Sequence, residues 1–525
     1  MKPFAALLDR LVLTPQRNAK LRLLAEYFAS VPDPDRGYGL AALTGELVFR
    51  NAKAGLIREL AMARVDPVLF GWSYDFVGDL AETTALVWPA RPVDRDWPHL
   101  AEVVDELAAG SRAALAGTVE GWLDALDPTG RWALLKLITG GLRVGVSARL
   151  AKTALAVRWA REVGEIEEVW HGLTPPYASL FAWLEGRGAK PVFANKPVFR
   201  PLMLANPLAD HEVAGLALED YAAEWKWDGI RVQIAAVGSE ARLYSRTGDD
   251  ISGSFPEIVR ALGFRGVLDG ELLVKRGAEV GSFNELQQRL GRKAPSARLI
   301  AEHPAMVHLY DILFDGEEDL RGLSFRERRV RLEAFVAEHA PPCMDVSPLV
   351  PFADLAELEA LRQGCRGSER EGLMLKRKDS VYLAGRPKGP WFKWKRDALT
   401  LDCVLMYAQR GHGRRSSFYS DYTFGVWRAG PEGDELVPVG KAYFGFTDDE
   451  LQQLDRHVRE HTVRRYGPVR EVTPSLVLEI AFDSVHRSTR HKSGVAMRFP
   501  RVHRIRWDKP APEADRLELV ERLVE

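Results

Sequence analysis

Residues 224–231 read Glu-Trp-Lys-Trp-Asp-Gly-Ile-Arg, in which charged and aromatic side chains alternate up to a glycine. A strand over 222–228 places Glu224, Lys226 and Asp228 on one face, because successive side chains of a strand point in opposite directions. The two tryptophans then pack into the core from the other face and hold the lysine at the edge of a pocket. A lysine there can act as a nucleophile only as a neutral amine, which requires burial or a neighbouring cation. A half-buried strand whose lysine pairs with Asp228 explains this stretch equally well.

Six further short motifs follow this stretch along the chain. In order they read Ser-Arg-Thr-Gly (245–248), Asp-Gly-Glu (269–271), Tyr-Asp-Ile-Leu-Phe (310–314), Glu-Gly-Leu-Met-Leu-Lys (371–376), Trp-Phe-Lys-Trp-Lys (391–395) and Arg-Phe-Pro-Arg (498–501), the last followed by Asp508 and Lys509. Lys393 and Lys395 stand two positions apart, so on a strand both face the same way. They suit a phosphate on which negative charge develops, although a solvated strand face is the alternative.

Together with the opening stretch, these motifs resemble in kind and order those of the nucleotidyltransferase superfamily that contains the ATP-dependent DNA ligases. The resemblance implies that Lys226 attacks the α-phosphate of ATP and carries AMP as a lysyl-adenylate. It implies that Glu224 accepts the adenine amino group and that Tyr310 stacks on the base. Arg231 and Glu271 would hold the ribose. The predicted ATP-binding residues are Glu224, Arg231, Arg246, Glu271, Tyr310, Arg386, Lys393, Lys395, Arg498 and Lys509.

Some of these positions depart from the family's pattern or have a second interpretation. The family more often has phenylalanine at the position of Tyr310, and Arg386 stands one residue farther from the lysine pair than usual. Met374 either covers the other face of the adenine or is an ordinary core methionine. Glu371 and Glu271 are the predicted ligands for Mg²⁺ or Mn²⁺, because hard cations take oxygen ligands. An exposed turn carboxylate is the alternative for Glu371.

Three stretches favour DNA over RNA as the substrate. Residues 283–292 resemble the helix that follows the third motif in DNA ligases, and 199–205 resemble the entry to their catalytic domain. Residues 140–150 resemble the Arg-x-Gly loop with which the DNA-binding domain of larger ligases grips the duplex backbone. Arg143 would contact phosphate there, because its neighbouring glycines let the main chain approach closely. A plain turn between helices is the alternative.

Other basic residues are predicted to contact DNA phosphates. Arg414 and Arg415 lie in a glycine-rich stretch, and Arg501 belongs to the last motif. Contacts of this kind give weak sequence preference and strong salt dependence. The alternative for Arg414 and Arg415 is the solvated rim of a barrel.

The distribution of apolar residues predicts three domains. Helical spacing dominates 1–195, and a stretch rich in proline and glycine at about 186–201 marks a linker. Strands with intervening helices fill 196–397, and evenly spaced strands around one helix fill 398–525. The resemblance assigns these parts to an all-α DNA-binding domain, an α+β nucleotidyltransferase domain (an ATP-grasp-like ligase adenylation domain) and an all-β OB-fold.

Composition sets outer limits on function. The 525 residues are 46% hydrophobic and 28% charged, which is typical of soluble multidomain proteins. No apolar run is long enough to span a membrane, and the three scattered cysteines exclude a thiolate zinc ribbon and favour a reducing compartment. The net charge of −1 leaves room for local basic patches. We expect a monomeric, cytoplasmic and nucleoid-associated protein whose partners are ATP and nicked duplex DNA.

The sequence therefore predicts an ATP-dependent DNA ligase. AMP would pass from Lys226 to the 5′-phosphate of a nick, and the 3′-hydroxyl would then displace it. Arg498, Asp508 and Lys509 would orient the pyrophosphate in the first step, with the barrel closing through a hinge near 396–398. Over its whole length the chain most resembles a bacterial subgroup labelled as cisplatin damage-response ligases, which implies a role in repair. The alternatives are an RNA ligase or capping-type transferase, an inactive DNA-binding scaffold, and an N-terminal region that mainly binds other proteins.

Overall fold

The computed structural model describes residues 1–89, 96–193, 195–260, 262–277, 279–292, 294–365, 369–410, 418–431, 433–489 and 491–524. They form two compact units. One consists of Met1–Leu60 and Trp88–Arg396, and the other of Ala61–Val87 and Asp397–Glu525. The predicted domain boundaries at 195 and 397 stay predictions. Among the described residues, no helix has both the length and the apolar character that a bilayer crossing requires.

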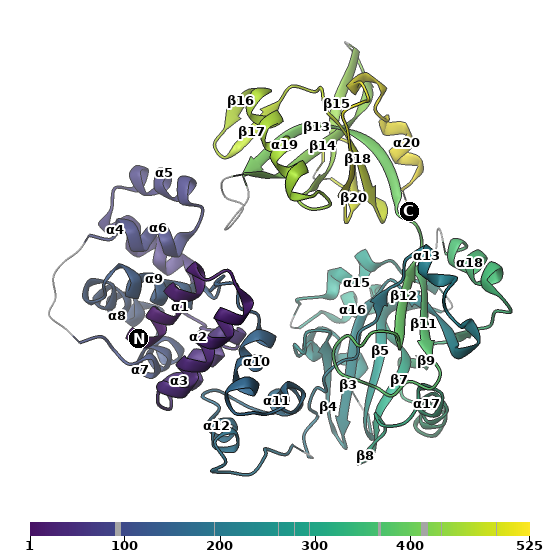
Figure 1. Ribbon diagram of the computed structural model, residues 1–525, viewed down its shortest axis with the longest axis horizontal. Helices are drawn as coiled ribbons and strands as arrows, with labels where there is room; N and C mark the ends of the chain where they lie inside the picture. The colour runs from purple at the N-terminus through teal and green to yellow at the C-terminus, as the bar shows by residue number, and fades with distance from the viewer. Residues whose placement is uncertain are drawn as a thin grey trace. The chain divides into compact units, whose positions relative to one another are not determined.

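Helices make up the first part of the larger unit, as the apolar spacing predicts (Figure 1). They are α1 (Lys2–Leu13), α2 (Arg17–Ser30), α3 (Asp35–Thr44), the start of α4 (Ala54–Arg64), α7 (Leu100–Ala109), α8 (Arg112–Ala125), α9 (Pro128–Thr139), α10 (Ala148–Arg158), α11 (Val163–Trp170) and α12 (Ala178–Leu184). In α1 the predicted stripe of Phe4, Leu7, Leu8 and Leu11 is buried. Helix α2 packs against α10, and α1 packs against α9.

Two sheets form the rest of the larger unit. The first has the order β1 (Asn206–Pro207), β12 (Trp391–Lys395), β11 (Arg370–Arg377), β2 (Tyr221–Trp227) and β10 (Leu349–Val350). The second has the order β4 (Glu240–Ser245), β3 (Ile230–Val237), β5 (Arg265–Arg276), β7 (Ala305–Asp315) and β8 (Glu318–Asp319), with β6 (Glu279–Val280) beside β5 and β9 (Met344–Val346) beside β7. Most pairs are antiparallel, and β1 with β12 and β7 with β9 are the parallel pairs among these strands.

Helices cover these sheets. They are α13 (Asp210–Val213), α14 (Pro256–Val259), α15 (Phe283–Arg289), α16 (Ala297–Glu302), α17 (Phe325–His339) and α18 (Leu355–Gln363). Helix α17 packs on β7, where Leu332 and Phe335 join the apolar core of the second sheet. In α15, Arg289 is fully buried and forms an ion pair with Glu257, so this arginine is structural.

Asp228 and Gly229 connect the two sheets, because β2 ends at Trp227 and β3 begins at Ile230. A Cβ on Gly229 would lie 2.5 Å from the carbonyl oxygen of Leu272 in β5. Only glycine therefore lets the chain cross from one sheet to the other this closely. The opening stretch of the sequence thus contributes one strand to each sheet.

The smaller unit contains a helical hairpin and a barrel-like sheet. The hairpin is α5 (Pro67–Val77) and α6 (Leu80–Val87). The barrel consists of β13 (Leu399–Arg410), β14 (Tyr419–Gly430), β15 (Gly433–Ala442), β16 (Thr462–Tyr466), β17 (Val469–Val472), β18 (Val477–Phe482) and β21 (Arg501–Arg506), with the ribbon β19 (Ser484–Arg487) and β20 (Val495–Arg498). Its core includes Tyr422, Phe424 and Ile480. Besides the expected helix, here α19 (Asp448–Glu460), the chain adds a short α20 (Leu517–Arg522).

Candidate nucleotide site

Lys226 meets Glu371 through a β-bulge in β11. Pairing with β2 sets Arg370 opposite Trp227 and Gly372 opposite Lys226, which leaves Glu371 as the extra residue of the bulge. Glu371 consequently reaches the face of Lys226, with which it forms an ion pair. Without the bulge, strict alternation would turn this carboxylate to the other face of the sheet. The bulge is therefore what brings the predicted nucleophile and the predicted metal ligand together.

The two lysines of β12 lie on the same face of this sheet. Lys395 stands opposite Gly372 of β11, and Lys393 stands opposite Met374. Residues directly opposite each other share a face, so both lysines follow the row that begins at Lys226. Lys395 also reaches the Glu371 carboxylate, at 3.2 Å. The alternative of a merely solvated strand face is thereby less favoured, since one carboxylate joins two of the predicted lysines.

Glu371 is held in its ionised form by these lysines. Burial works against ionisation, but the charges of Lys226 and Lys395 outweigh it and lower the pKa of Glu371 to about 2. The carboxylate is half-buried, which argues against the exposed turn that the sequence left open. An ionised, partly desolvated carboxylate is a suitable ligand for a hard cation.

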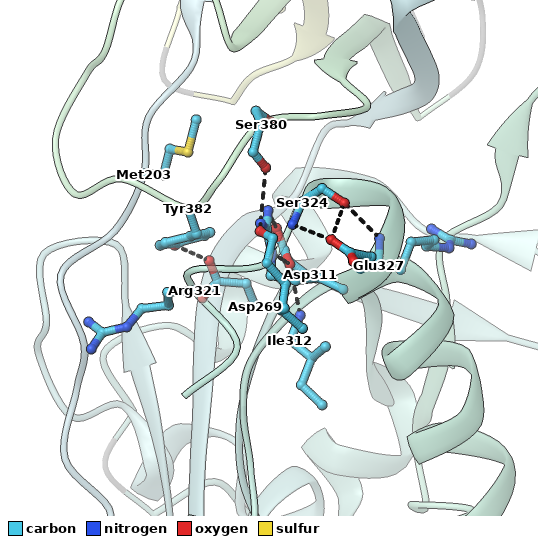
Figure 2. A network of polar contacts seen from close by, with 12 residues as sticks. Met203, Asp269, Asp311, Ile312, Arg321, Ser324, Glu327, Ser380 and Tyr382 are labelled. Carbon is cyan, nitrogen blue, oxygen red and sulfur yellow. Dashed lines mark hydrogen bonds and ion pairs between the residues drawn. The ribbon is translucent and has the colours of Figure 1, made fainter. Parts of the chain in front are cut away.

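Arg231 and Glu271 face each other on β3 and β5. The Arg231 guanidinium donates hydrogen bonds to Asp269 at 2.8 Å, to the carbonyl oxygen of Met203 at 2.6 Å and to the Tyr382 hydroxyl at 3.2 Å. Tyr382 in turn donates to Asp269 at 2.5 Å, and Figure 2 shows the two side chains pointing toward one another. Arg231 is therefore fixed by the protein before any nucleotide binds.

Glu271, on β5 of the second sheet, lies within the electrostatic reach of Lys226 on the first sheet. Burial raises the pKa of Glu271 to about 7, while the charges of Lys226 and Arg231 act against the shift. Glu371 and Asp228 raise it further, so these carboxylates share the same surroundings. Mg²⁺ is commonly bound through one or two carboxylates together with substrate phosphates. Glu271 and Glu371 fit that pattern as a partial ligand set, and among the described residues no cluster of three or more His, Cys, Asp or Glu side chains is placed to hold a metal.

The charges of two further predicted ATP-binding residues, Arg246 and Arg386, reach β12. Burial lowers the pKa of Lys393, and the next causes are the charges of Lys226, Arg386, Lys395 and Arg246, in that order. Arg246 comes from the turn after β4, and Arg386 from the segment before β12. Arg386 is therefore close enough for its charge to act on Lys393, despite its unusual spacing in the sequence.

Glu224 lies on the same face of β2 as Lys226, as alternation predicts, and it is buried. It is 2% exposed, and its carboxylate lies 2.6 Å from the ammonium group of Lys376 and 3.4 Å from the guanidinium of Arg329. Burial raises the pKa of Glu224, and the charges of Lys376 and then Arg329 oppose that shift. The two cations thus favour an ionised acceptor at the place predicted for the adenine amino group.

Lys376 is a functional candidate that the sequence reasoning missed. Its side chain is 1% exposed, and its ammonium group lies 4.3 Å from the ring centre of Tyr310, 4.6 Å from that of Trp391 and 5.0 Å from that of Phe325. Alternation along β11 offered a signal, because Lys376 follows Gly372 at even spacing. Arg329, on α17, carried no such signal.

Of the two tryptophans of β2 that the sequence predicts to be buried, only Trp227 is. Trp227 is buried, stacks on His308 with ring centres 4.7 Å apart, and donates a hydrogen bond to the Ser347 hydroxyl at 3.1 Å. Trp225 is only partly buried, and the guanidinium of Arg370 lies 4.3 Å from its ring centre. Trp227 therefore anchors the strand in the core, whereas Trp225 is covered by a charged side chain.

The barrel residues predicted to bind ATP are held within their own unit. Lys509 forms an ion pair with Asp402 at 2.8 Å, and this hydrogen bond raises the pKa of Lys509. A hydrogen bond from Arg506 lowers the pKa of Asp508 to about 2. Arg498 ends β20. Asp402, on β13, is another residue that the sequence reasoning missed.

The predicted DNA contacts are only partly described. Arg143 is exposed in the turn between α9 and α10, with φ of 49°. Arg501 begins β21 and pairs with Asp483 at 3.2 Å. Arg414 and Arg415 lie outside the described residues.

The chain is similar to known proteins over its whole length. Residues 202–395 match the family described as ATP dependent DNA ligase domain, and residues 415–509 match the ATP dependent DNA ligase C terminal region. A probable DNA ligase of Koribacter versatilis (strain Ellin345) is 32% identical, over 100% of this chain and 96% of that protein. DNA ligase 1 of Korarchaeum cryptofilum (strain OPF8) is 30% identical, over 100% of this chain and 98% of that protein.

A solved structure titled Pmar-Lig_PreS3 resembles the chain with a TM-score of 0.60 at 16% identity, covering 96% of this chain and 99% of that one. At this identity the likeness concerns the fold alone. Taken together, the family matches confirm the predicted adenylation domain and a C-terminal OB-like domain. DNA binding by the N-terminal helices stays a prediction.

Proposed function

Because the chain belongs to the ATP-dependent DNA ligases, which seal nicks in duplex DNA, we propose how its residues divide that reaction. The observation that carries the proposal is the shared face of Lys226, Glu371, Lys393 and Lys395, produced by the bulge in β11. One nucleophile, one carboxylate and two further cations on a single face match the needs of attack on a phosphate.

In the first step the Lys226 amine attacks the α-phosphate of ATP. A phosphorus–nitrogen bond forms, the bond from the α-phosphorus to the bridging oxygen breaks, and pyrophosphate leaves with the electron pair. The lysine must lose a proton before it attacks. Lys393 and Lys395 lie where negative charge builds up on the phosphate oxygens. Glu371 and Glu271 would hold Mg²⁺ or Mn²⁺, which would polarise the phosphate as a Lewis acid.

The remaining residues select and orient the nucleotide. Glu224 accepts a hydrogen bond from the adenine amino group, and Tyr310 stacks on the base. Arg231, held by Asp269 and Tyr382, reaches the ribose together with Glu271. Arg246, on the phosphate or the ribose, completes the nucleotide contacts together with Arg386, Arg498 and Lys509. Fixed donors of this kind lower the barrier because they need no reorganisation during the reaction.

The N-terminal helices are proposed to bind the duplex, with Arg143 on a phosphate and Arg501, Arg414 and Arg415 as further backbone contacts. AMP then passes to the 5′-phosphate of the nick, and the 3′-hydroxyl displaces it. We propose a monomer that acts at the nucleoid, since one chain carries all the motifs. A repair role rests on the resemblance to the damage-response subgroup.

Transfer of label from [α-³²P]ATP to the protein tests the nucleophile. Lys226→Ala should carry no label, whereas Lys378→Ala, which removes an exposed lysine of the same unit, should label like the parent protein. Intact mass of the parent should rise by one AMP and fall again when nicked DNA is added. Label on the Lys226→Ala protein would contradict the assignment.

A further inference from the structure

Lys20, in the first turn of α2, is a buried lysine whose ammonium group lies under the turn between α9 and α10. Its side chain is 7% exposed. The ammonium group donates hydrogen bonds to the carbonyl oxygens of Val144 at 2.5 Å and Gly145 at 3.1 Å, although these residues stand 124 and 125 positions away in the chain. The turn that contains Arg143 is thus tied to a distant helix through its backbone.

The turn itself has a constrained backbone. Gly140 and Gly145 have φ of 72° and 67°, and Arg143, which is not glycine, has φ of 49°. Residues with side chains occupy this left-handed region only at a cost, so the surrounding structure must hold Arg143 there. A Cβ on Gly145 would lie 2.5 Å from the Lys20 nitrogen, so a side chain at this position would push the ammonium group away. Lys20 and the turn are therefore fitted to each other.

A charged group is an expensive way to hold a turn. Burying an ammonium group is unfavourable even when carbonyl oxygens solvate it, and apolar packing stabilises most turns at lower cost. Val144, which is buried in the same turn, already supplies such packing. The charge has a further effect, because it places positive potential directly beneath a backbone that carries an exposed arginine. That combination suits a phosphate group.

We propose that Lys20 is a positioning residue for duplex DNA. It fixes the backbone of the 140–147 turn so that Arg143 faces a phosphate, and its own charge strengthens the attraction from below. This inference rests on the proposed role of Arg143 in DNA binding. It adds a residue from α2 that carries no recognisable motif.

Affinity for a nicked duplex, measured by fluorescence anisotropy over a series of salt concentrations, tests the proposal. Arg143→Ala should weaken binding about tenfold and reduce the slope of log K against log salt by about 1, as expected for one lost phosphate contact. Lys20→Met should do the same, and the double variant should lose little more, because both residues act through one turn. Self-adenylation should be unchanged in all three. Lys2→Met, which removes an exposed lysine of α1, is the matched control and should bind normally.

The outcomes distinguish the positioning role of Lys20 from the phosphate contact proposed for Arg143. Normal binding and a normal salt slope for Lys20→Met, with a loss for Arg143→Ala, would overturn the role of Lys20 and leave that of Arg143 intact. Normal binding by Arg143→Ala would instead overturn the proposed contact on which the inference depends. If Lys20→Met does not fold, Gly145→Ala decides, because its Cβ would push the Lys20 ammonium group away from the carbonyl oxygens that it holds. A folded Gly145→Ala protein with normal affinity and slope would refute the proposal.

Discussion

Replacing Gly372 with alanine would disturb the bulge that carries Glu371 to the nucleophile. The backbone at Gly372 has φ of 142°, and such a conformation costs a residue with a side chain about 1–3 kcal/mol. The new Cβ would also lie 2.3 Å from the carbonyl oxygen of Trp394 and 2.8 Å from the Cα of Lys395. Both neighbours are backbone atoms, so relief requires β12 to shift or the bulge to straighten. A straight β11 would turn Glu371 away from Lys226.

The expected result is a large loss in the rate of self-adenylation, accompanied by a loss of stability. Removing one positioned electrostatic contact typically costs about 10²–10³ in rate, so self-adenylation should slow at least about 100-fold. The free energy of unfolding should fall by about 2–6 kcal/mol, the sum of backbone strain and steric conflict. Single-turnover transfer from [α-³²P]ATP measures the rate, and urea unfolding measures the stability.

Gly433→Ala is the matched control. Gly433 has φ of 126°, but a Cβ there would have no neighbour within 4 Å. This variant therefore carries the backbone strain without the collision, and it lies in β15 of the barrel, not in β11 or a strand paired with it. It should lose about 1–3 kcal/mol of stability and keep its self-adenylation rate. A normal rate in Gly372→Ala, or the same loss of rate in both variants, would refute the role of the bulge.

Three further predictions concern groups whose surroundings the structure defines. Lys376→Met should raise KM for ATP in self-adenylation about tenfold, because Glu224 would lose its nearer cation and accept a proton; unchanged KM would contradict this. Asp402→Asn should slow label transfer several-fold but not the sealing of pre-adenylated nicks, since only the first step needs Lys509 in place; equal slowing of both steps would argue against it. The pKa of Glu271 is about 7, above its ordinary value of 4.5, so the folded protein binds the extra proton and loses stability as pH rises from 4.5 to 7. Denaturation midpoints of Glu271→Gln should lack this decline, and parallel curves for the two proteins would contradict the assignment.

Much of the site follows from the sequence because strand alternation is a strong local rule. It correctly places Lys393 and Lys395 on one face, and it predicts the burial of Trp227. The same rule is wrong about full burial of Trp225, where an arginine on the neighbouring strand covers the ring. Local alternation cannot see that arginine, because β11 is far away in the sequence.

The remaining features depend on contacts between distant parts of the chain. The bulge at Glu371 adds one residue to β11, and only the register with β2 reveals it. The ion pair between Asp402 and Lys509 and the hydrogen bonds from Lys20 to the 140–147 turn each join residues more than a hundred positions apart. Sequence patterns indicate which residues are charged, but the partner of each charge is decided by tertiary packing.

The crossing at Asp228 and Gly229 limits the distance between two residues of the proposed nucleotide site. Lys226 and Arg231 sit on different sheets yet are separated by only five steps of chain. Fully extended, five residues reach at most about 18 Å, so the separation of the Cα atoms of Lys226 and Arg231 has a covalent upper limit. Neither sheet can drift from the other without straining this tether. The motif therefore limits how far the two sheets, and the residues proposed to bind the ribose and the phosphate, can separate.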